Sequence, residues 1–312
     1  MMKKLQQNTG AIPALWLVHG CILFSTTLVA TSFTVGKAIA PALDPGIIIL
    51  LRFICAACFF IPYIHWQYKL TSPSAADLFR YSLISGVLVG FFWSMFLALR
   101  FTTALNTGVI FTLVPGISSV YSAVLIKEKL GMYRLASLLP ATLGALWVIF
   151  EGNLQRMLSL ELNQGDLIFF FGCLLMALYT PLVKRLHRGE PMAIMTFWIL
   201  VTGCGWLLVL SGYKLPTVAW MDIQPKIWVG IIYLAIFTTI ITFFVSQWAT
   251  LYLGPTRVIA YSFLYPPLIV LIEWLLGKGI PPLSTLLGVL LILPAMFIIQ
   301  RGVKRQSTSR KQ

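Results

Sequence analysis

Residues 45–63 read PGIIILLRFICAACFFIPY, and this stretch decides the class of the fold. It is apolar except for Arg52, and a helix of about 20 such residues is what the hydrocarbon core of a bilayer requires. Nine more runs of this kind cover about residues 14–38, 79–101, 104–126, 132–150, 166–184, 191–212, 227–248, 256–276 and 282–300. The sequence therefore predicts an all-α integral membrane protein with ten transmembrane helices.

The composition of the whole chain agrees with this prediction. Of its 312 residues, 59% are hydrophobic and 10% are charged, whereas a soluble domain carries about 25% charged residues. The short connections leave no room for a separate soluble domain, which argues against most enzymes and against an ATP-driven pump. The sequence has no glycine-rich phosphate loop, and its histidines are scattered. Cys55 and Cys58 have metal or redox spacing, but no further ligands lie near them in this apolar segment, so the sequence predicts no metal or redox site there. We therefore expect no catalytic site, no cofactor and no bound metal.

The charge of the chain indicates its orientation. The net charge of +14 could suggest a nucleic-acid partner, but the basic residues lie in short clusters between the apolar runs. If the N-terminus is cytoplasmic, sixteen basic residues fall on that side of the membrane and six on the other, with Arg52 inside a span. The positive-inside rule then places both termini in the cytoplasm. The expected partners are the bilayer and a small-molecule substrate, with no nucleic acid, and the chain is expected to be a monomer.

An internal repeat is indicated when the sequence is shifted by about 150 residues. Pro115 then meets Pro266 with one residue of slack, and Gly152 meets Gly302. Two repeats of five spans each must have opposite orientations, because an odd number of spans ends on the far side of the membrane. The predicted units are residues 1–152 and 153–312, the second with a basic cytoplasmic tail. Inverted repeats are typical of secondary transporters, whose substrate site lies near the membrane midplane.

Several motifs resemble the EamA pattern of the drug/metabolite transporter superfamily. The first half contributes Lys37, Pro45, Leu51-Arg52-Phe53, residues 98–104, Pro115, Glu128 and Leu130; the second contributes Gly165-Asp166, Ala177-Leu178-Tyr179, Lys184 and Leu264-Tyr265-Pro266. Two features depart from the pattern: Gly277-Lys278-Gly279 replaces an expected acidic residue, and Thr31 and Leu178 stand where tryptophan is frequent. The resemblance implies a 5+5 transporter fold and favours amino acids or related amphipathic metabolites as substrates.

Polar and aromatic residues within the spans are the candidate substrate contacts. Hydroxyl and amide groups in a bilayer must face protein or water, and tyrosine combines a flat apolar face with a hydroxyl that needs a partner. The candidate substrate-binding residues are Thr31, Trp93, Asn106, Tyr179, Thr238, Thr242, Tyr261 and Tyr265. The alternative interpretation is that these side chains only pack helices together or face lipid.

Proline and charge single out four further positions. Pro115 and Pro266 each remove a backbone hydrogen bond at corresponding places in the two halves, which makes them candidate hinges. Arg52 could bind a carboxylate or simply orient its helix, and Glu273 could carry a proton or pair with Lys278.

The sequence thus favours a secondary-active exporter of amino acids or related metabolites in the bacterial inner membrane, working by alternating access. Two alternatives stay open. One is an importer of a nucleoside-like or cofactor-like metabolite, and the other is a membrane protein that transports nothing.

Overall fold

The structure, a computed structural model, describes residues 13–68, 72–127, 132–155 and 163–309. Within these ranges the chain forms helices and no strands. The α-helices are α2 (Leu15–Ile39), α3 (Pro45–Tyr68), α4 (Ala75–Ala98), α5 (Ala104–Phe111), α6 (Val114–Ile126), α7 (Met132–Ile149), α9 (Gln164–Leu186), α10 (Met192–Ser211), α11 (Pro225–Ala235), α12 (Thr242–Leu253), α13 (Pro255–Ala260), α14 (Tyr265–Leu275) and α15 (Leu283–Ser309).

The prediction of a multi-pass, all-α membrane protein is confirmed. The described part contains eight helical segments that are long and apolar enough to cross a membrane. The two remaining predicted spans fall on α7 and α15, whose apolar stretches, Leu139–Ile149 and Leu283–Ala295, are shorter. Ten spans, the 5+5 repeat and the cytoplasmic termini therefore stay predictions. Glu128, Leu130 and Arg156 lie outside the described residues, as does the end of the basic tail from residue 310.

Three predicted spans are not continuous α-helices. The fourth span divides into α5 and α6, and the ninth divides into α13, a 3₁₀ turn (Tyr261–Leu264) and α14. The eighth span contains a π-helical turn, Ile236–Ile241, between α11 and α12. Apolar periodicity does not detect such breaks, because the hydrophobic run continues through them.

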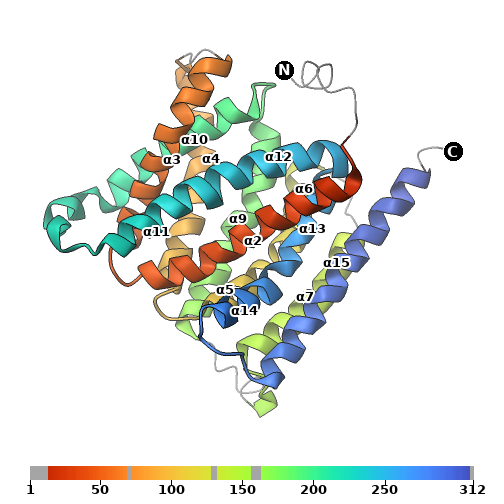
Figure 1. Ribbon diagram of the computed structural model, residues 1–312. Coiled ribbons are helices and arrows are strands. Elements are labelled where there is room, and N and C mark those ends of the chain that lie inside the picture. Colours follow the sequence, from red (N-terminus) through yellow and green to blue (C-terminus); the bar gives the residue numbers. More distant parts are fainter. Residues whose placement is uncertain (1–12, 69–71, 128–131, 156–162, 310–312) are drawn as a thin grey trace.

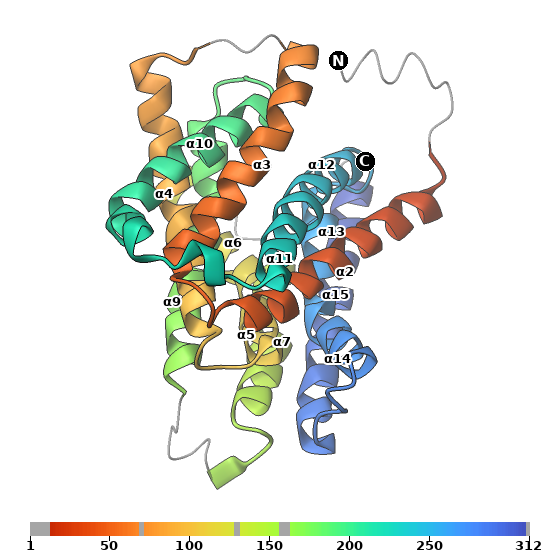
Figure 2. The same cartoon turned by 60° about the vertical axis from the view of Figure 1, so that its left-hand side comes forward.

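The helices pack so that segments distant in sequence lie side by side (Figures 1 and 2). Helix α7 runs along α15, α4 packs on α9, and α10 packs on both α3 and α4, while α2 lies against α12 and α14. The described free ends of α2 and α15 lie on the same side of the molecule in both views. Buried aromatic rings fill the centre, among them Phe33, Phe53, Phe96, Phe169 and Phe263.

Close approach of α7 and α15 depends on glycine. A Cβ at Gly144 would lie 2.6 Å from Ile292 Cγ1 and 2.7 Å from the Gly288 carbonyl oxygen. A Cβ at Gly288 would in turn lie 2.8 Å from Val148 Cγ2. Small residues at such crossings let membrane helices come into backbone contact.

Candidate functional site

The first element of the site is the break between α5 and α6. The Thr103 side chain caps α5 by accepting the Asn106 amide at 3.0 Å. Pro115 lies in the first turn of α6 and has no N–H to donate to the carbonyl of Phe111, so one backbone hydrogen bond of a continuous helix is missing at this break. The break places Phe111 and Pro115 at the centre of the molecule.

The second element is the corresponding break in the ninth span. Helix α13 tightens into the 3₁₀ turn Tyr261–Leu264, and α14 then begins at Tyr265 with Pro266 in its first turn. The two proline-containing breaks, one in each half of the chain, thus flank the same region of the bundle.

A cavity of about 270 Å³ lies between these breaks and helices α2, α9 and α12. We call it the central cavity. It is lined by Ile22, Ser25, Thr26, Val29, Phe111, Val114, Pro115, Met176, Thr180, Ser246, Thr250, Val258, Ile259, Tyr261, Ser262 and Tyr265. The lining combines apolar and aromatic side chains with hydroxyl groups and contains no charged residue. Such a surface suits a small amphipathic solute.

Among the described residues, one fully buried hydroxyl in the lining, that of Ser262, lacks a hydrogen-bond partner. Within the described residues, the buried Ser262 Oγ makes no hydrogen bond, and a buried polar group is normally paired. The neighbouring Tyr261 hydroxyl lies 2.5 Å from His19 Nδ1 on α2 and so links the 3₁₀ turn to the first described helix. A polar atom supplied by a solute could therefore pair with Ser262.

A layer of aromatic rings closes one side of the central cavity. The Tyr265 ring lies 5.5 Å from that of Phe111 and 5.9 Å from that of Phe33, measured between centroids. Behind them, Phe91 lies 5.8 Å from Phe111. Edge-on and tilted contacts of this kind are favourable.

The structure brings together some of the residues singled out in the sequence and separates others. Tyr261, Tyr265 and Pro115 line the central cavity, and Pro266 is buried beside it. The other candidates are not in the lining; they are Thr31, Trp93, Asn106, Tyr179, Thr238, Thr242, Arg52 and Glu273.

The candidates outside the lining have other surroundings. Thr31 hydrogen-bonds to the Tyr233 hydroxyl at 2.6 Å, and Thr242 donates to the Thr238 carbonyl at 3.0 Å. Trp93 is 38% exposed on α4, and Tyr179 packs in a separate apolar cluster. Glu273 pairs with Lys278 at 3.0 Å, which is the alternative that the sequence left open for it.

Asn106 contacts the Asp166 carboxylate, which was not among the candidate site residues of the sequence. Its side-chain amide donates to Asp166 at 3.2 and 3.3 Å, and the Thr102 hydroxyl donates to the same carboxylate at 2.5 Å. Asp166 is only 3% exposed and lies in the first turn of α9. It therefore ties α9 to the turn after α4 and to α5. The sequence placed Asp166 in the Gly165-Asp166 motif at the start of an apolar run, but assigned it no contact.

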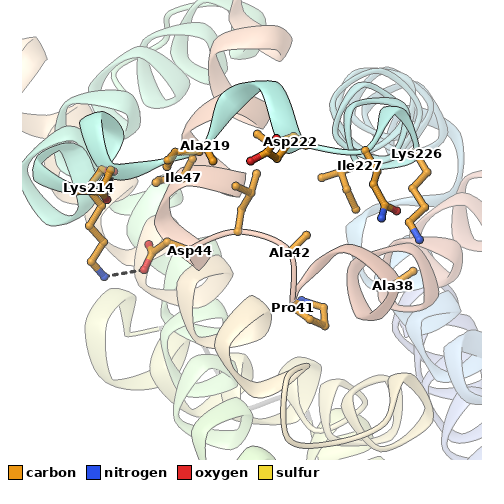
Figure 3. A pocket seen from close by; sticks show the side chains of 15 residues that line it. Ala38, Pro41, Ala42, Asp44, Ile47, Lys214, Ala219, Asp222, Lys226 and Ile227 are labelled. Carbon is orange, nitrogen blue, oxygen red and sulfur yellow. Dashed lines mark hydrogen bonds and ion pairs between the residues drawn. The ribbon is translucent and has the colours of Figure 1, made fainter.

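A larger cavity of about 620 Å³, the charged pocket, lies between the α2–α3 turn and residues 212–227 (Figure 3). On one side of it, Lys214 Nζ lies 2.6 Å from Asp44 Oδ2. Burial raises the pKa of Asp44, but hydrogen bonds from Lys214, the Gly46 amide and Ser211 outweigh this, so the pKa stands below its ordinary value. Asp222 and Lys226 line the opposite side and make no ion pair within the described residues.

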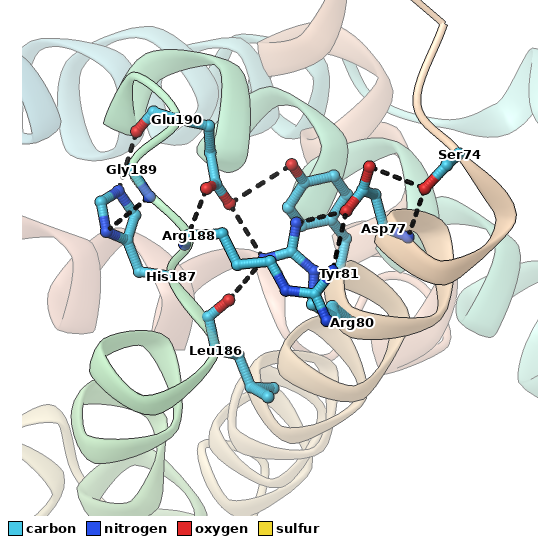
Figure 4. Close-up of polar contacts among 9 residues, drawn as sticks. All are labelled: Ser74, Asp77, Arg80, Tyr81, Leu186, His187, Arg188, Gly189 and Glu190. Atoms are coloured by element: carbon cyan, nitrogen blue, oxygen red, sulfur yellow. Dashed lines mark hydrogen bonds and ion pairs between the residues drawn. The ribbon is translucent and has the colours of Figure 1, made fainter.

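A second polar cluster lies in the first turns of α4, the helix that follows α3 (Figure 4). Arg80 Nη2 lies 2.5 Å from Asp77 Oδ1, and Arg80 Nη1 lies 3.3 Å from Glu190 Oε1. Arg80 also donates to the Leu186 carbonyl. Burial raises the pKa of Glu190. Hydrogen bonds from backbone amides and the charge of Arg80 outweigh this effect, so the pKa stands below its ordinary value. The cluster ties the start of α4 to the loop between α9 and α10.

Comparison with other proteins gives a consistent result. Residues 16–150 and 163–301 match the EamA-like transporter family. The chain is 26% identical over 207 residues to an uncharacterized transporter, YyaM, of Bacillus subtilis, covering 66% of this chain and 68% of that protein. It is 25% identical over 206 residues to a riboflavin transporter of Vibrio cholerae, covering 63% of this chain and 62% of that protein, which is less than two thirds of its length.

One solved crystal structure of a protein superimposes with a TM-score of 0.63 at 16% identity, covering 91% of this chain and 97% of the other. At that identity the likeness establishes the fold alone. The family match, together with the apolar helices, identifies a multi-pass membrane transporter of a small molecule. The chain belongs to the EamA-like transporter family, which confirms the resemblance seen in the sequence.

Proposed function

We propose that this protein is a secondary-active transporter of the bacterial inner membrane that exports amino acids or related small amphipathic metabolites by alternating access. In this proposal both termini are cytoplasmic, the chain works as a monomer, and two inverted repeats of five helices each enclose the pathway. The family match and the bacterial relatives support the general class, and the cavity supports the type of solute.

The observation that carries the proposal is the central cavity between two broken helices. The cavity joins Phe111 and Pro115 from the first half with Tyr261, Ser262 and Tyr265 from the second. Discontinuous helices at the interface of two repeats are where secondary transporters place their substrate. The unpaired Ser262 hydroxyl supplies a hydrogen-bonding group for a solute, and the Tyr265 ring supplies an apolar face.

The breaks also suggest how the cavity changes its access. Pro115 and Pro266 interrupt their helices, so each pair of half-helices can rotate with little loss of backbone hydrogen bonding. We expect rocking at these positions to part the rings of Phe33, Phe111 and Tyr265 and so open the cavity on its other side. Alternating access of this kind needs no ATP-binding domain, because a solute or ion gradient supplies the driving force.

A second candidate function is the import of a flat, neutral, cofactor-like solute. The Vibrio cholerae relative is named as a riboflavin transporter. A lining of rings and hydroxyls without a charged residue also suits a neutral aromatic molecule that carries hydroxyl groups.

The experiment measures flux in both directions. Cells that express the protein are loaded with dipeptides, which raise their internal amino acids, and release of amino acids is followed by mass spectrometry; uptake of labelled riboflavin is measured in parallel. Selective release of one amino-acid group supports the first function, and riboflavin uptake without such release supports the second.

Variants connect the flux to the cavity. Tyr265→Ala should reduce transport at least about tenfold, because it removes both the ring and the hydroxyl from the lining. Leu271→Ala, on the same helix but 47% exposed, is the matched control and should leave transport unchanged. If both variants transport as the wild type does at equal expression, the central cavity is not the substrate site.

A further inference from the structure

Arg52 is a buried charge without a counter-ion. Its side chain extends from α3 in the centre of the bundle, and the residue is only 2% exposed. No acidic side chain pairs with it among the described residues. Its contacts are the hydroxyls of Thr238 and Thr239, at 2.9 to 3.2 Å, and the ring of Phe92, whose centroid lies 4.4 Å from the guanidinium carbon.

The local structure around the guanidinium is specific. Thr238 and Thr239 lie in the π-helical turn, and both hydroxyls donate to the carbonyl of Leu234, at 2.9 and 3.0 Å. In a π-helical turn a backbone N–H bonds to the carbonyl five residues earlier, and the Thr239 side-chain hydroxyl bonds over the same separation. Because both hydroxyl protons point to this carbonyl, both oxygens remain as acceptors for Nε and Nη2 of Arg52. Turns of this kind occur frequently at functional sites.

The remaining nitrogen is the informative one. Nη1 of Arg52 is buried and makes no hydrogen bond within the described residues. Arginine keeps its charge in proteins, and a charge within a bilayer is costly unless it is paired. Two hydroxyls and one ring compensate for this only in part. Nη1 of Arg52 is therefore a positively charged hydrogen-bond donor to which an anion can bind.

We infer that Arg52 binds the carboxylate of the transported solute through Nη1 at an intermediate stage of transport. This inference rests on the proposed transport function and narrows its substrates to carboxylates, amino acids included. Arg52 lies behind the aromatic layer: Phe92 contacts Phe91 at 5.0 Å, and Phe91 contacts Phe111 of the central cavity at 5.8 Å. The solute would meet Arg52 only after these rings separate. On the opposite side, Arg52 is five residues along α3 from Ile47, a lining residue of the charged pocket.

The test compares a carboxylate group with an uncharged carboxamide in the same place, in proteoliposomes. L-phenylalanine and L-phenylalaninamide are the flux probes, and phenylacetate and phenylacetamide are the binding probes, followed by the thermal unfolding midpoint of the purified protein. The wild type should prefer the acid over the amide at least about tenfold, because a charge-assisted hydrogen bond is the difference between them. Phenylacetate should raise the unfolding midpoint and phenylacetamide should not.

The variants separate a binding role from a structural one. Arg52→Gln should abolish the preference, Arg52→Lys should retain part of it, and Thr239→Val, which keeps the charge and the shape of the site, should weaken it. Each is compared at equal yield of monodisperse protein. Equal handling of acid and amide by the wild type, or an unchanged preference in Arg52→Gln, overturns the inference. The same holds if chloride raises the midpoint as phenylacetate does, because the site would then hold an inorganic anion.

The results distinguish a failure of the Arg52 inference from a failure of the proposed transport function. Phenylalanine flux without acid preference removes the role of Arg52 and leaves the transporter intact. Protection by phenylacetate that depends on Arg52, with no amino-acid flux, keeps the carboxylate site and removes amino-acid export.

Discussion

Removing the Asp166 carboxylate should destabilise the protein by about 2–5 kcal/mol. In Asp166→Ala, the buried Thr102 hydroxyl and the half-buried Asn106 amide both lose their acceptor. A buried polar group left unpaired costs about 1–3 kcal/mol, with the lower end applying to Asn106 because water reaches it. Loss of an anion from the first turn of α9 adds about 0.3–1 kcal/mol.

The assay is reversible unfolding of the purified protein in mixed micelles by titration with a denaturing detergent, followed by tryptophan fluorescence. Asp166→Asn is the near-isosteric control. It keeps an oxygen for Thr102 and should lose only about 1–2 kcal/mol. The exposed Asp222→Ala should stay within about 0.5 kcal/mol of the wild type. An Asp166→Ala protein as stable as the wild type would refute the assignment of Asp166 as the tie between α9 and the α4–α5 turn.

Two further predictions concern pH and helix packing. Because the pKa of Asp44 is lower in the folded protein, its stabilising contribution is full above the unfolded value of about 3.9 and is lost as the pH falls through the folded value. The unfolding midpoint of the wild type should therefore decrease when the pH is lowered below about 4. The Asp44→Asn variant should be less stable at neutral pH and should lose this part of the pH dependence. At the α7–α15 crossing, Gly144→Ala should cost about 1–3 kcal/mol, because the added Cβ meets backbone atoms. Gly205→Ala is its control; no atom lies within 4 Å of a Cβ there, so stability should be unchanged or higher, and equal losses in both would contradict the packing argument.

The sequence predicted the type of fold well because that prediction depends on composition and run length. The apolar run of residues 45–63 became α3, and the runs near 79–101 and 166–184 became α4 and α9, with shifts of a few residues. Pro115 and Pro266, which the sequence singled out as candidate hinges at corresponding places in the two halves, lie in the first turns after helix breaks. Proline alone was not the signal, because α3 continues through Pro62 and α9 through Pro181. The π-helical turn at Ile236–Ile241 carries no proline and gave no signal of this kind.

The candidate site was predicted only in part. Tyr261 and Tyr265 both line the central cavity, one at the start of the 3₁₀ turn and the other directly after it. Trp93 belongs to the same class of side chain but faces outward on α4, and Asn106 faces Asp166. A sequence position does not state which face of its helix meets the pathway, since that depends on the crossing of helices distant in the chain.

The sequence by itself determined that the chain enters the membrane and is helical there. Each apolar run must satisfy its own backbone hydrogen bonds in lipid, and only local structure can do this. It also marked Arg52 as exceptional, because a charge in an apolar run is costly in any arrangement. Only the tertiary structure decided that Arg52 meets the hydroxyls of Thr238 and Thr239, about 190 residues away, and keeps Nη1 unpaired. Those contacts are set by the packing of α3 against the π-helical turn. The local sequence of neither segment indicates which distant helix it packs on.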